Sequence, residues 1–461
     1  MIERGWIMRT TTAAAALALG GCISMAPHYE RPAAPVAATF PGAGTAAGGA
    51  AAQTGWHDYF ADARLRQLIE LALANNRDLR VAILNIEQAR AQYQIRRADM
   101  LPTVNLGATG SRVPGSNDSI TSNYTAGLMV SAFELDLFGR VRSLSNSAQA
   151  QYLATEEARK STHISLVAAV ANAYLGLLAD DELLALTRQT LAGRDDSLKL
   201  VQLKYDQGVV SKLDLQQANS LLEAARVAAA QQQRQRAQDE HLLVLLVGQS
   251  LPGTLAPPAT LAATSLAELP AGLPSDLLAQ RPDIVQAEQQ LMAANANIGA
   301  ARAAFFPHIS LTGSAGSAST ALNGLFKSGS YGWTFAPQAL MPLFDFGRNS
   351  ANLAGAKAAR EVALAQYEKA IQAAFREVSD ALAGQATYGE QLRAQRAVAA
   401  AEGERYGLSE LRYKNGAASY LELLDAQRSL FGAQQAAVQA NLARLQNQVA
   451  LYKVLGGGWQ Q

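Results

Sequence analysis

The sequence is poor in the residues on which most enzymes and metal proteins depend. It has one cysteine and five histidines among 461 residues. One cysteine cannot form an intrachain disulfide or a zinc site made of cysteines. The histidines are scattered without metal-ligand spacing, and no glycine-rich phosphate loop is present. The net charge of +1 provides no basic field for nucleic acid. We therefore expect no enzyme, no cofactor, no metal site and no nucleic-acid partner.

Aromatic residues and long apolar runs are also scarce. Aromatic residues make up 7% of a chain in which 49% of the residues are hydrophobic, and alanine and glutamine are abundant. This mixture favours long helices over sheets. The most apolar stretch beyond the N-terminal region, residues 164–179, is shorter than the roughly 20 residues that a membrane-spanning helix needs, and it contains Asn172. If the chain crosses a membrane, we expect it to do so with strands.

The beginning of the sequence resembles the export signal of a bacterial lipoprotein. Two arginines precede a short apolar run, and LGGC follows at 19–22. A charged segment, an apolar segment and a small-residue cleavage site define such a signal. We expect a signal peptide over 1–21 and a palmitate-containing lipid anchor on Cys22. Ile23, where inner-membrane lipoproteins carry aspartate, indicates the outer membrane by the same resemblance. An ordinary signal peptide with a chance cysteine, and a later start at Met8, stay open.

The second half of the sequence repeats landmarks of the first half. LDLFGR at 135–140 recurs as LFDFGR at 343–348, an offset of 208 residues. Landmarks before this motif keep an offset of 205, and landmarks after it keep 208. The matched pairs are Arg97 and Arg302, Pro102 and Pro307, Leu106 and Leu311, Tyr205 and Tyr413, Gly208 and Gly416, and Ser211 and Ser419. Matches at a fixed spacing indicate a tandem duplication of a long unit.

The duplication divides the chain into successive segments, and each repeat has the same order of elements. We expect a lipid-anchored extended arm over 22–61, repeat 1 over 62–250, a proline-rich linker over 251–274, repeat 2 over 275–455 and a tail over 456–461. In each repeat, short helices come first, then a β-hairpin, then two long helices. The expected helices are 62–74, 79–99, 139–206 and 211–247 in repeat 1, and 275–280, 282–304, 347–414 and 419–455 in repeat 2.

The two expected hairpins, at about 103–137 and 308–345, alternate with a period of two residues. One face of each strand is apolar, and the other carries small or polar residues. This pattern fits a soluble hairpin and also the strands of a transmembrane barrel, and alternation alone does not choose between them. Each hairpin ends in the repeated motif. Gly139–Arg140 and Gly347–Arg348 therefore mark joints where a strand becomes a long helix, because glycine permits a sharp change of direction.

Tight turns join the two long helices of each repeat. Gly208 and Gly416 are helix stop signals, and Ser211 and Ser419 are start signals. Helix, turn and helix make an αα-hairpin in each repeat. We expect both turns to lie at one end of a long helical body, away from the strands.

Acidic residues follow these start signals. Glu422 and Asp425 are spaced i and i+3 on one helical face, and Asp214 takes the place of Glu422 in repeat 1. Ser419 with Glu422 fits a capping box, so capping and compensation of the helix dipole explain Glu422 at least as well as a functional role does. Asp425 lies one turn further into the helix, where capping explains less.

The number of strands predicts an oligomer. Two hairpins give about four strands per chain, too few to close a membrane barrel. Open strand edges cannot be left in lipid, because unpaired backbone groups are costly there. The strands must therefore close with those of other chains. Two chains give about eight strands around an interior filled by side chains, whereas three chains give about twelve strands and leave a lumen.

The chain as a whole resembles the outer membrane factor family of the TolC/OprM type, in its NodT-like lipoprotein branch. The resemblance rests on LGGC (19–22), YERP (29–32), LDLFGR (135–140), RPDI (281–284), LFDFGR (343–348) and the tips that end in LDLQQA and LELLDAQRSL. It implies a mixed fold, in which three chains share one twelve-stranded membrane β-barrel and one twelve-helix periplasmic α-barrel. The termini and the linker would form an equatorial belt in this homotrimer.

The same resemblance implies a function. The family provides the outer membrane exit duct of tripartite efflux pumps, which passively conducts drugs or other small toxic compounds from a periplasmic adaptor and an inner-membrane RND-type transporter to the outside. It also makes Glu422, Asp425 and Asp214 candidates for a periplasmic gate. Ala418 departs from the pattern, because some relatives carry a charged gate residue there. A duct for type I protein secretion and a coiled-coil lipoprotein without a pore are the alternative functions.

Overall fold

The computed structural model describes residues 24–37, 39–40, 55–114, 119–267 and 281–458. The expected signal peptide, Cys22 and the expected helix at 275–280 lie outside the described residues. The chain divides into two units. Unit 1 combines 1–34, 84–156 and 285–369, and unit 2 combines 35–83, 157–284 and 370–461. Each unit therefore takes segments from both halves of the sequence.

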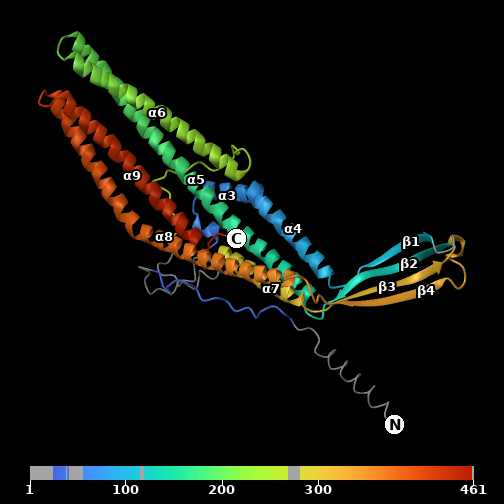
Figure 1. Cartoon of the computed structure of the whole chain (residues 1–461). Coiled ribbons are helices and arrows are strands. Elements are labelled where there is room, and N and C mark those ends of the chain that lie inside the picture. The colour runs from blue at the N-terminus through green and yellow to red at the C-terminus, as the bar shows by residue number, and fades with distance from the viewer. Residues whose placement is uncertain (1–23, 38, 41–54, 115–118, 268–280, 459–461) are drawn as a thin grey trace. The chain divides into compact units, whose positions relative to one another are not determined.

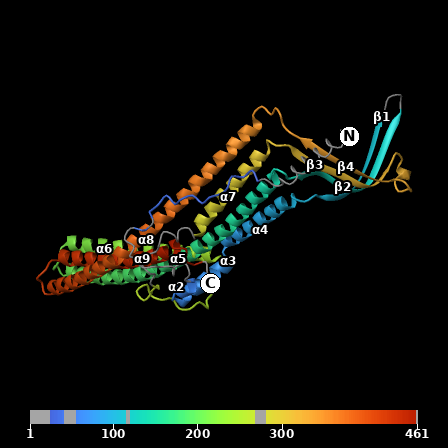
Figure 2. The ribbon, with the colours of Figure 1, turned by 90° about the horizontal axis from the view of Figure 1, so that it is seen from below.

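Unit 1 contains one antiparallel sheet, in the order β1-β2-β3-β4 (Figures 1 and 2). Its strands are β1 (Val104–Pro114), β2 (Ile120–Leu135), β3 (His308–Ser319) and β4 (Tyr331–Leu340). Each hairpin contributes two neighbouring strands, and β2 pairs with β3 to join the hairpins. The short 3-10 helix η2 (Leu322–Gly324) lies in the loop of the second hairpin. Within the described residues, β1 and β4 are the two edges of the sheet.

The two faces of the sheet differ as the alternation predicts. One transverse row of opposed residues is apolar, and it consists of Leu106, Leu128, Ala315 and Trp333. Leu106 is 83% exposed and Trp333 is 72% exposed. Large apolar side chains that alternate along strands and face outward are typical of a surface that another apolar phase covers.

The next row on the opposite face contains only glycine, and it consists of Gly107, Gly127, Gly316 and Gly332. β2 and β3 approach closely at its centre. A Cβ atom on Gly127 would lie 2.4 Å from the Ala315 carbonyl oxygen. A Cβ atom on Gly316 would lie 2.2 Å from the Ala126 carbonyl oxygen. These neighbours are backbone atoms, so the two central positions exclude every larger residue.

Long helices make up most of the remaining structure. Apart from α2, which lies in the segment expected to be an extended arm, their positions agree with the sequence prediction to within a few residues. The helices are α2 (Trp56–Tyr59), α3 (Ala63–Asn75), α4 (Arg77–Ala98), α5 (Arg140–Asp206), α6 (Lys212–Val247), α7 (Pro282–Ala303), α8 (Arg348–Lys414) and α9 (Tyr420–Val454). The described part of the chain has one helix, α5, with a window apolar enough to span a membrane, and 67% of that window is buried. Such burial is what a core helix shows.

Glycine and aspartate form the joints between strand and helix. Gly139 has φ 73° and Gly347 has φ 85°, so both adopt the left-handed conformation that glycine favours. At the repeat 1 joint, the Asp136 carboxylate accepts hydrogen bonds from the backbone N–H groups of Val141 and Arg142, at 3.1 and 2.8 Å. These contacts satisfy the first turn of α5. The sequence analysis identified the glycines but overlooked this capping aspartate.

The second joint also has a capping aspartate, Asp345, which is the third residue of its motif, whereas Asp136 is the second residue of the first motif. The Asp345 carboxylate accepts from the backbone N–H groups of Gly347 and Asn349, at 3.0 and 2.8 Å. These bonds to the ionised form lower the pKa of the Asp345 carboxyl group. Both long helices therefore begin with a negative charge at their positive end.

The base of unit 2 is a buried aromatic and aliphatic core. Tyr59 and Tyr452 stack with ring centroids 4.0 Å apart. Leu65, Leu68 and Ile69 of α3 are fully buried around them. Segments from both ends of the sequence thus meet in one core, in which Tyr452 of α9 packs on Tyr59.

Candidate functional site

The tip of the α5–α6 hairpin is built from a helix stop with two specific backbone bonds. The Val209 N–H donates to the Lys204 carbonyl at 2.9 Å, and the Gly208 N–H donates to the Tyr205 carbonyl at 2.8 Å. This is the Schellman pattern, which needs a left-handed residue after the helix. Gly208 supplies it with φ 72°. The sequence prediction of a stop at Gly208 is confirmed.

The tip of the α8–α9 hairpin repeats this geometry. The Ala417 N–H donates to the Arg412 carbonyl at 2.8 Å, and the Gly416 N–H donates to the Tyr413 carbonyl at 3.1 Å. Gly416 has φ 73°. The two turns therefore have the same backbone, and differences between the tips arise from their side chains.

The helix starts differ between the tips. Ser211 and Asp214 form a complete capping box: the Asp214 N–H donates to the Ser211 hydroxyl at 3.2 Å, and the Ser211 N–H donates to the Asp214 carboxylate at 3.0 Å. At the second tip, the Glu422 N–H donates to the Ser419 hydroxyl at 3.2 Å. The Glu422 carboxylate instead accepts from Arg412 at 2.7 Å. The capping box expected at Ser419 is thus only half formed, because a charge-assisted bond to arginine competes for the acid.

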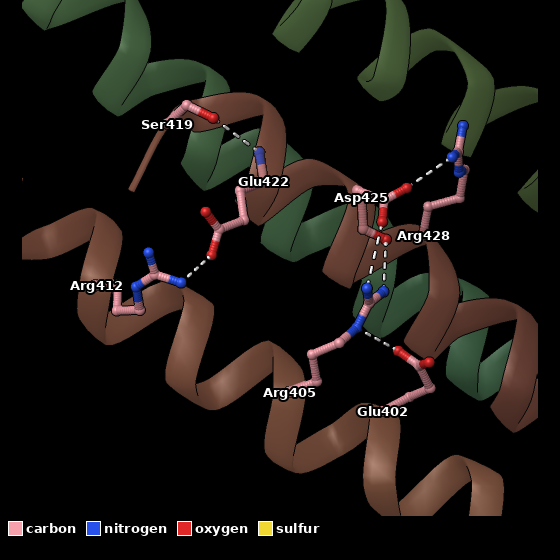
Figure 3. Close-up of polar contacts among 7 residues, drawn as sticks. All are labelled: Glu402, Arg405, Arg412, Ser419, Glu422, Asp425 and Arg428. Atoms are coloured by element: carbon pink, nitrogen blue, oxygen red, sulfur yellow. Dashed lines mark hydrogen bonds and ion pairs between the residues drawn. The ribbon is translucent and has the colours of Figure 1, made fainter. Parts of the chain in front are cut away.

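Asp425 lies between two arginines (Figure 3). Arg428, one turn further along α9, donates to its carboxylate at 2.8 Å. Arg405, on α8, reaches the other carboxylate oxygen and the Asp425 carbonyl, both at 3.4 Å. Arg405 also donates to Glu402 at 2.7 Å. Asp425 therefore links the two helices of this hairpin, as the Arg412–Glu422 pair also does.

These ion pairs are partly exposed. The side chains of Glu422 and Asp425 are 39% and 45% exposed. Three acids, including Glu402, face three arginines, so the cluster as drawn is close to neutral. Exposed ion pairs contribute only about 0–1 kcal/mol each, so they exchange partners readily. The arrangement can hold the two helices in one position and release them at low cost.

The sequence analysis found the acids but missed the arginines. Arg428 follows Asp425 by three residues, and this spacing is a signal that the sequence does contain. Arg405 precedes Asp425 by 20 residues and meets it only because the hairpin folds back. Arg412 meets Glu422 across the same turn.

Comparisons with known proteins identify the family of the chain. The model of the family described as outer membrane efflux protein matches residues 68–249 and 273–457. The chain belongs to the outer membrane efflux protein family. This membership agrees with the expectation that the chain is not an enzyme, because the family is one of efflux proteins.

Individual relatives agree over nearly the full length. The toluene efflux pump outer membrane protein TtgC of Pseudomonas putida is 50% identical over 461 residues, which cover 97% of this chain and 95% of that protein. The outer membrane protein OprJ of Pseudomonas aeruginosa is 46% identical over 459 residues, which cover 97% and 95% of the two chains. The open state of the outer membrane channel MtrE of Neisseria gonorrhoeae matches with a TM-score of 0.87 and 42% identity, covering 95% of this chain and 99% of that chain. The mostly helical fold with a β component is thus shared with solved efflux channels.

In this outer membrane efflux protein, the two tips lie side by side (Figures 1 and 2), and a small core holds them together. Its buried residues are Val201, Ala218, Tyr420, Leu423 and Leu424. The Tyr420 hydroxyl lies 3.0 Å from the Ser197 hydroxyl, and burial raises the pKa of Tyr420. Tyr420 therefore stays neutral and fastens α9 to α5. The tips of the two hairpins form one structural element.

The lysine and the arginine at matched positions of the two repeats make different contacts. Lys204 occupies in repeat 1 the place of Arg412 in repeat 2. Its ammonium group lies 4.6 Å from the centre of the Tyr413 ring and 3.4 Å from its hydroxyl oxygen. Lys204 thus reaches across to the second hairpin, whereas Arg412 stays within its own. This cation–π contact adds a second fastening between the hairpins.

Proposed function

We propose that this protein is the outer membrane duct of a tripartite efflux pump, through which drugs and other small toxic compounds leave the cell passively. Family membership supports the efflux role. The observation that carries the duct is the four-stranded sheet with an apolar face and two unpaired edges. In lipid, the backbone N–H and C=O groups at such edges have no hydrogen-bond partners unless further strands close the sheet into a barrel. The polar, glycine-containing face would then line the lumen.

We further propose a homotrimer, built on a tandem duplication with the segment boundaries given above. Three chains would contribute about twelve strands, enough for a barrel with an open interior. The paired long helices of three chains would form a twelve-helix barrel that extends the duct into the periplasm. The element order supports the duplication, because α4, β1, β2, α5 and α6 recur as α7, β3, β4, α8 and α9.

The partners in this proposal are a periplasmic adaptor and an inner-membrane RND-type transporter. The names of two relatives, an efflux pump outer membrane protein and a toluene efflux pump outer membrane protein, support a pump as the setting of this chain. We assign the adaptor contact to the two tips. Their exposed apolar side chains favour this assignment, since Val209 is 67% exposed, Leu213 is 66% exposed and Leu421 is 64% exposed.

We propose that Cys22 carries a lipid in the outer membrane, and the arm after it supports this. Asn295 and Arg302 of α7 donate to the carbonyls of Pro27 and Met25, at 2.8 and 3.1 Å. The arm therefore runs antiparallel to α7. Its N-terminal part lies beside the C-terminal end of α7, shortly before the start of β3. Met25 is the third residue after Cys22 in the sequence.

A buried acid fastens the same arm further along. Arg31 donates two bonds of 2.7 Å to Glu288, and the Tyr29 hydroxyl donates a third at 3.0 Å. The side chain of Glu288 is 6% exposed. Bidentate arginine–carboxylate pairs fix geometry as well as charge. These bonds of Arg31 and Tyr29 to Glu288 would hold the arm on α7, on the C-terminal side of the proposed lipid anchor.

We assign the periplasmic gate to the cluster around Asp425 and Glu422. Three chains would bring three copies of each acid to the entrance of the tube. The arginine partners keep these carboxylates from repelling one another while the tips are closed. Exchange of the weak pairs Arg405–Asp425 and Arg412–Glu422 would open the entrance. Asp214 is already engaged in its own capping box, so we assign it a smaller part in gating.

Complementation and conductance test this function. Expression in a bacterium that lacks its own efflux duct should restore resistance to toluene and to antibiotics when a matching adaptor and transporter are present. The purified protein should behave as a trimer in light scattering and should conduct ions in a planar bilayer. A monodisperse monomer without conductance would overturn the proposed duct. A Cys22→Ser protein that still incorporates labelled palmitate would overturn the lipid site.

A further inference from the structure

A cavity of about 250 Å³ lies between the two long hairpins of unit 2. Its wall is built from α5 of repeat 1 and from α8 and α9 of repeat 2, and its lining includes Leu186, Arg194, Tyr406, Gln427, Leu430 and Phe431. Pockets for drug-sized ligands measure about 300–1,000 Å³, so this cavity suits a molecule with a single ring. A molecule bound there would touch both repeats of the chain.

The Arg194 guanidinium group in this wall has an unused edge. Its Nη1 donates to the Leu221 carbonyl at 2.9 Å, whereas its Nε is buried and has no hydrogen-bond partner within the described residues. Elsewhere in the chain, Arg31 binds the Glu288 carboxylate through its Nε and Nη2. The same edge of Arg194 is therefore suited to a carboxylate.

Arg194 also has no acid beside it, among the described residues, to balance its charge. Asp195 and Asp196, which follow it in the sequence, both pair with Lys199, at 2.7 and 3.2 Å. Burial lowers the pKa of Arg194, yet arginine stays charged because its ordinary pKa lies far above neutral pH. A partly buried cation without a carboxylate is costly, so an anionic ligand would stabilise it.

The duplication supplies no partner for Arg194 either. Its matched residue in repeat 2 is Glu402, which pairs with Arg405. Repeat 1 has Ser197 in the place of Arg405, so this ion pair is not repeated. The charge of Arg194 is therefore a feature of repeat 1 alone.

The α9 part of the wall offers a polar group of the opposite kind. Nε2 of Gln427 donates to the Tyr406 hydroxyl at 3.3 Å, whereas its Oε1 is buried and has no partner in the part of the chain that the structure describes. A hydroxyl group on a ligand would meet this amide, because a hydroxyl donates as well as accepts. Leu186 and Phe431 add apolar surface to the same cavity.

We infer that this cavity is a binding site for a small aromatic hydroxy acid. The carboxylate of the ligand would pair with the Arg194 guanidinium group, and its hydroxyl would bond to the Gln427 amide. Its ring would lie against Phe431 and Leu186. The paired bonds between arginine and carboxylate fix the orientation of the ligand as well as its charge.

A ligand at this place would act on the proposed gate. Tyr406 follows Arg405 in α8, and Gln427 lies two residues after Asp425 in α9, so the cavity adjoins the cluster of Figure 3. One molecule in contact with α5, α8 and α9 would hold the second hairpin against the first. We expect it to favour the closed entrance, an effect that rests on the proposed duct.

Calorimetric titration of the detergent-purified, full-length protein with 4-hydroxybenzoate tests the site. The unaltered protein should bind it saturably, with one molecule per chain. Benzoate lacks the hydroxyl, and 4-hydroxybenzamide lacks the charge, so each should bind more weakly. These two compounds test the Gln427 and the Arg194 contacts separately.

Variants of the arginine test the charged contact. Arg194→Gln should weaken binding of 4-hydroxybenzoate about tenfold or more, and should remove its advantage over 4-hydroxybenzamide. Arg194→Lys keeps the charge without the two-bond edge and should retain part of the affinity. The matched control is Arg188→Gln, which removes an exposed arginine of the same helix outside the cavity wall and should leave binding unchanged.

Gln427→Leu tests the polar contact. It should remove the advantage of 4-hydroxybenzoate over benzoate and leave the affinity for benzoate nearly as it was. An unchanged helical circular dichroism signal shows that each variant is folded.

Conductance in planar bilayers tests the effect on the entrance. 4-Hydroxybenzoate should lower the conductance of the unaltered protein, and the same concentration should not affect Arg194→Gln. Lowered conductance in both proteins would overturn an effect through this site.

The outcomes separate the site, its effect and the duct. Failure of 4-hydroxybenzoate to bind the unaltered protein, as when a neighbouring copy covers the cavity, would overturn the site, and so would equal binding to Arg194→Gln. Binding that leaves conductance unchanged would overturn the effect on the entrance and leave the site standing. Saturable, Arg194-dependent binding to a protein that does not conduct would overturn the duct and support the site.

Discussion

The Asn76 side-chain amide donates a hydrogen bond of 2.9 Å to the carbonyl of Leu246, near the end of α6. The matched residue in the second half is Arg281, which donates to the carbonyl of Val454, near the end of α9, at the same distance. The residue types differ, yet both satisfy a carbonyl that the last helical turn leaves free. In each repeat, the residue just before the shorter helix, α4 or α7, thus closes the base of the long helical hairpin.

Loss of the arginine at this base should destabilise unit 2. Arg281 also donates to Asp283 and Glu377, at 2.7 and 2.9 Å, and these bonds raise the pKa of its guanidinium group against the opposing effect of burial. We expect Arg281→Ala to cost about 2–3 kcal/mol, since it leaves a buried carbonyl unsatisfied and removes charge-assisted bonds. Thermal loss of the helical circular dichroism signal in detergent measures this. Asn76→Ala, which removes a neutral donor, should cost less, and an equal loss would show that the charges at Arg281 contribute nothing.

Glycine at the centre of the sheet should be indispensable. Gly127→Ala places a methyl group against the Ala315 carbonyl, so β2 and β3 must separate. We expect a strong reduction of assembled protein in the outer membrane, measured as the trimer that survives mild denaturant on a gel. Gly332→Ala in the same row is the control, because no atom lies within 4 Å of the added methyl group. Equal assembly of the two variants would contradict the close approach.

Removal of Asp425 should loosen the periplasmic entrance. Asp425→Ala leaves Arg405 and Arg428 without their shared carboxylate, and we expect a higher resting conductance in planar bilayers and greater sensitivity to bulky antibiotics. Asp195→Ala is the matched control, because Asp195 pairs with Lys199 within its own helix and lies outside the proposed gate. Conductance and permeability that match the unaltered protein would count against a gate at Asp425. Stability should change by no more than about 1 kcal/mol, since the pairs are exposed.

A carboxyl pair between α5 and α6 should make stability depend on pH. Burial, and then the Asp239 carboxylate beside it, raises the pKa of Asp180 from its ordinary 3.8 to about 7. Between these values the folded protein holds a proton that the unfolded chain has lost, so stability falls as the pH rises through this window. Asp180→Asn removes this penalty and retains a bond to Gln232, which lies 2.9 Å away.

We therefore expect Asp180→Asn to raise the thermal midpoint more at pH 8 than at pH 5, because more of the penalty is present at the higher pH. The control is Asp181→Asn, which loses the 2.5 Å contact with Arg236. Its effect should be small and similar at both pH values. A gain from Asp180→Asn that is as large at pH 5 as at pH 8 would show that the pair does not titrate in this range.

Most elements could be predicted because their signals are local. Proline-free stretches with abundant alanine predicted α5 and α8, and Gly208 and Gly416 predicted their ends. The prediction of a full capping box at Ser419 was wrong, and the reason lies in the tertiary structure. Glu422 has the right spacing for a box, but the fold brings Arg412 within 2.7 Å of it, and the ion pair takes the carboxylate.

By itself, the sequence determined the repeated order of helices and strands, the turn residues and the acids behind them, because period, glycine and capping residues act within a few positions of the chain. Only the tertiary structure decided which charges meet. Arg405 reaches Asp425, Arg31 reaches Glu288 and Asp180 faces Asp239 because segments separated by 20 to 257 residues of chain pack side by side. Pairing across such distances depends on the packing of whole elements, and no local pattern records it.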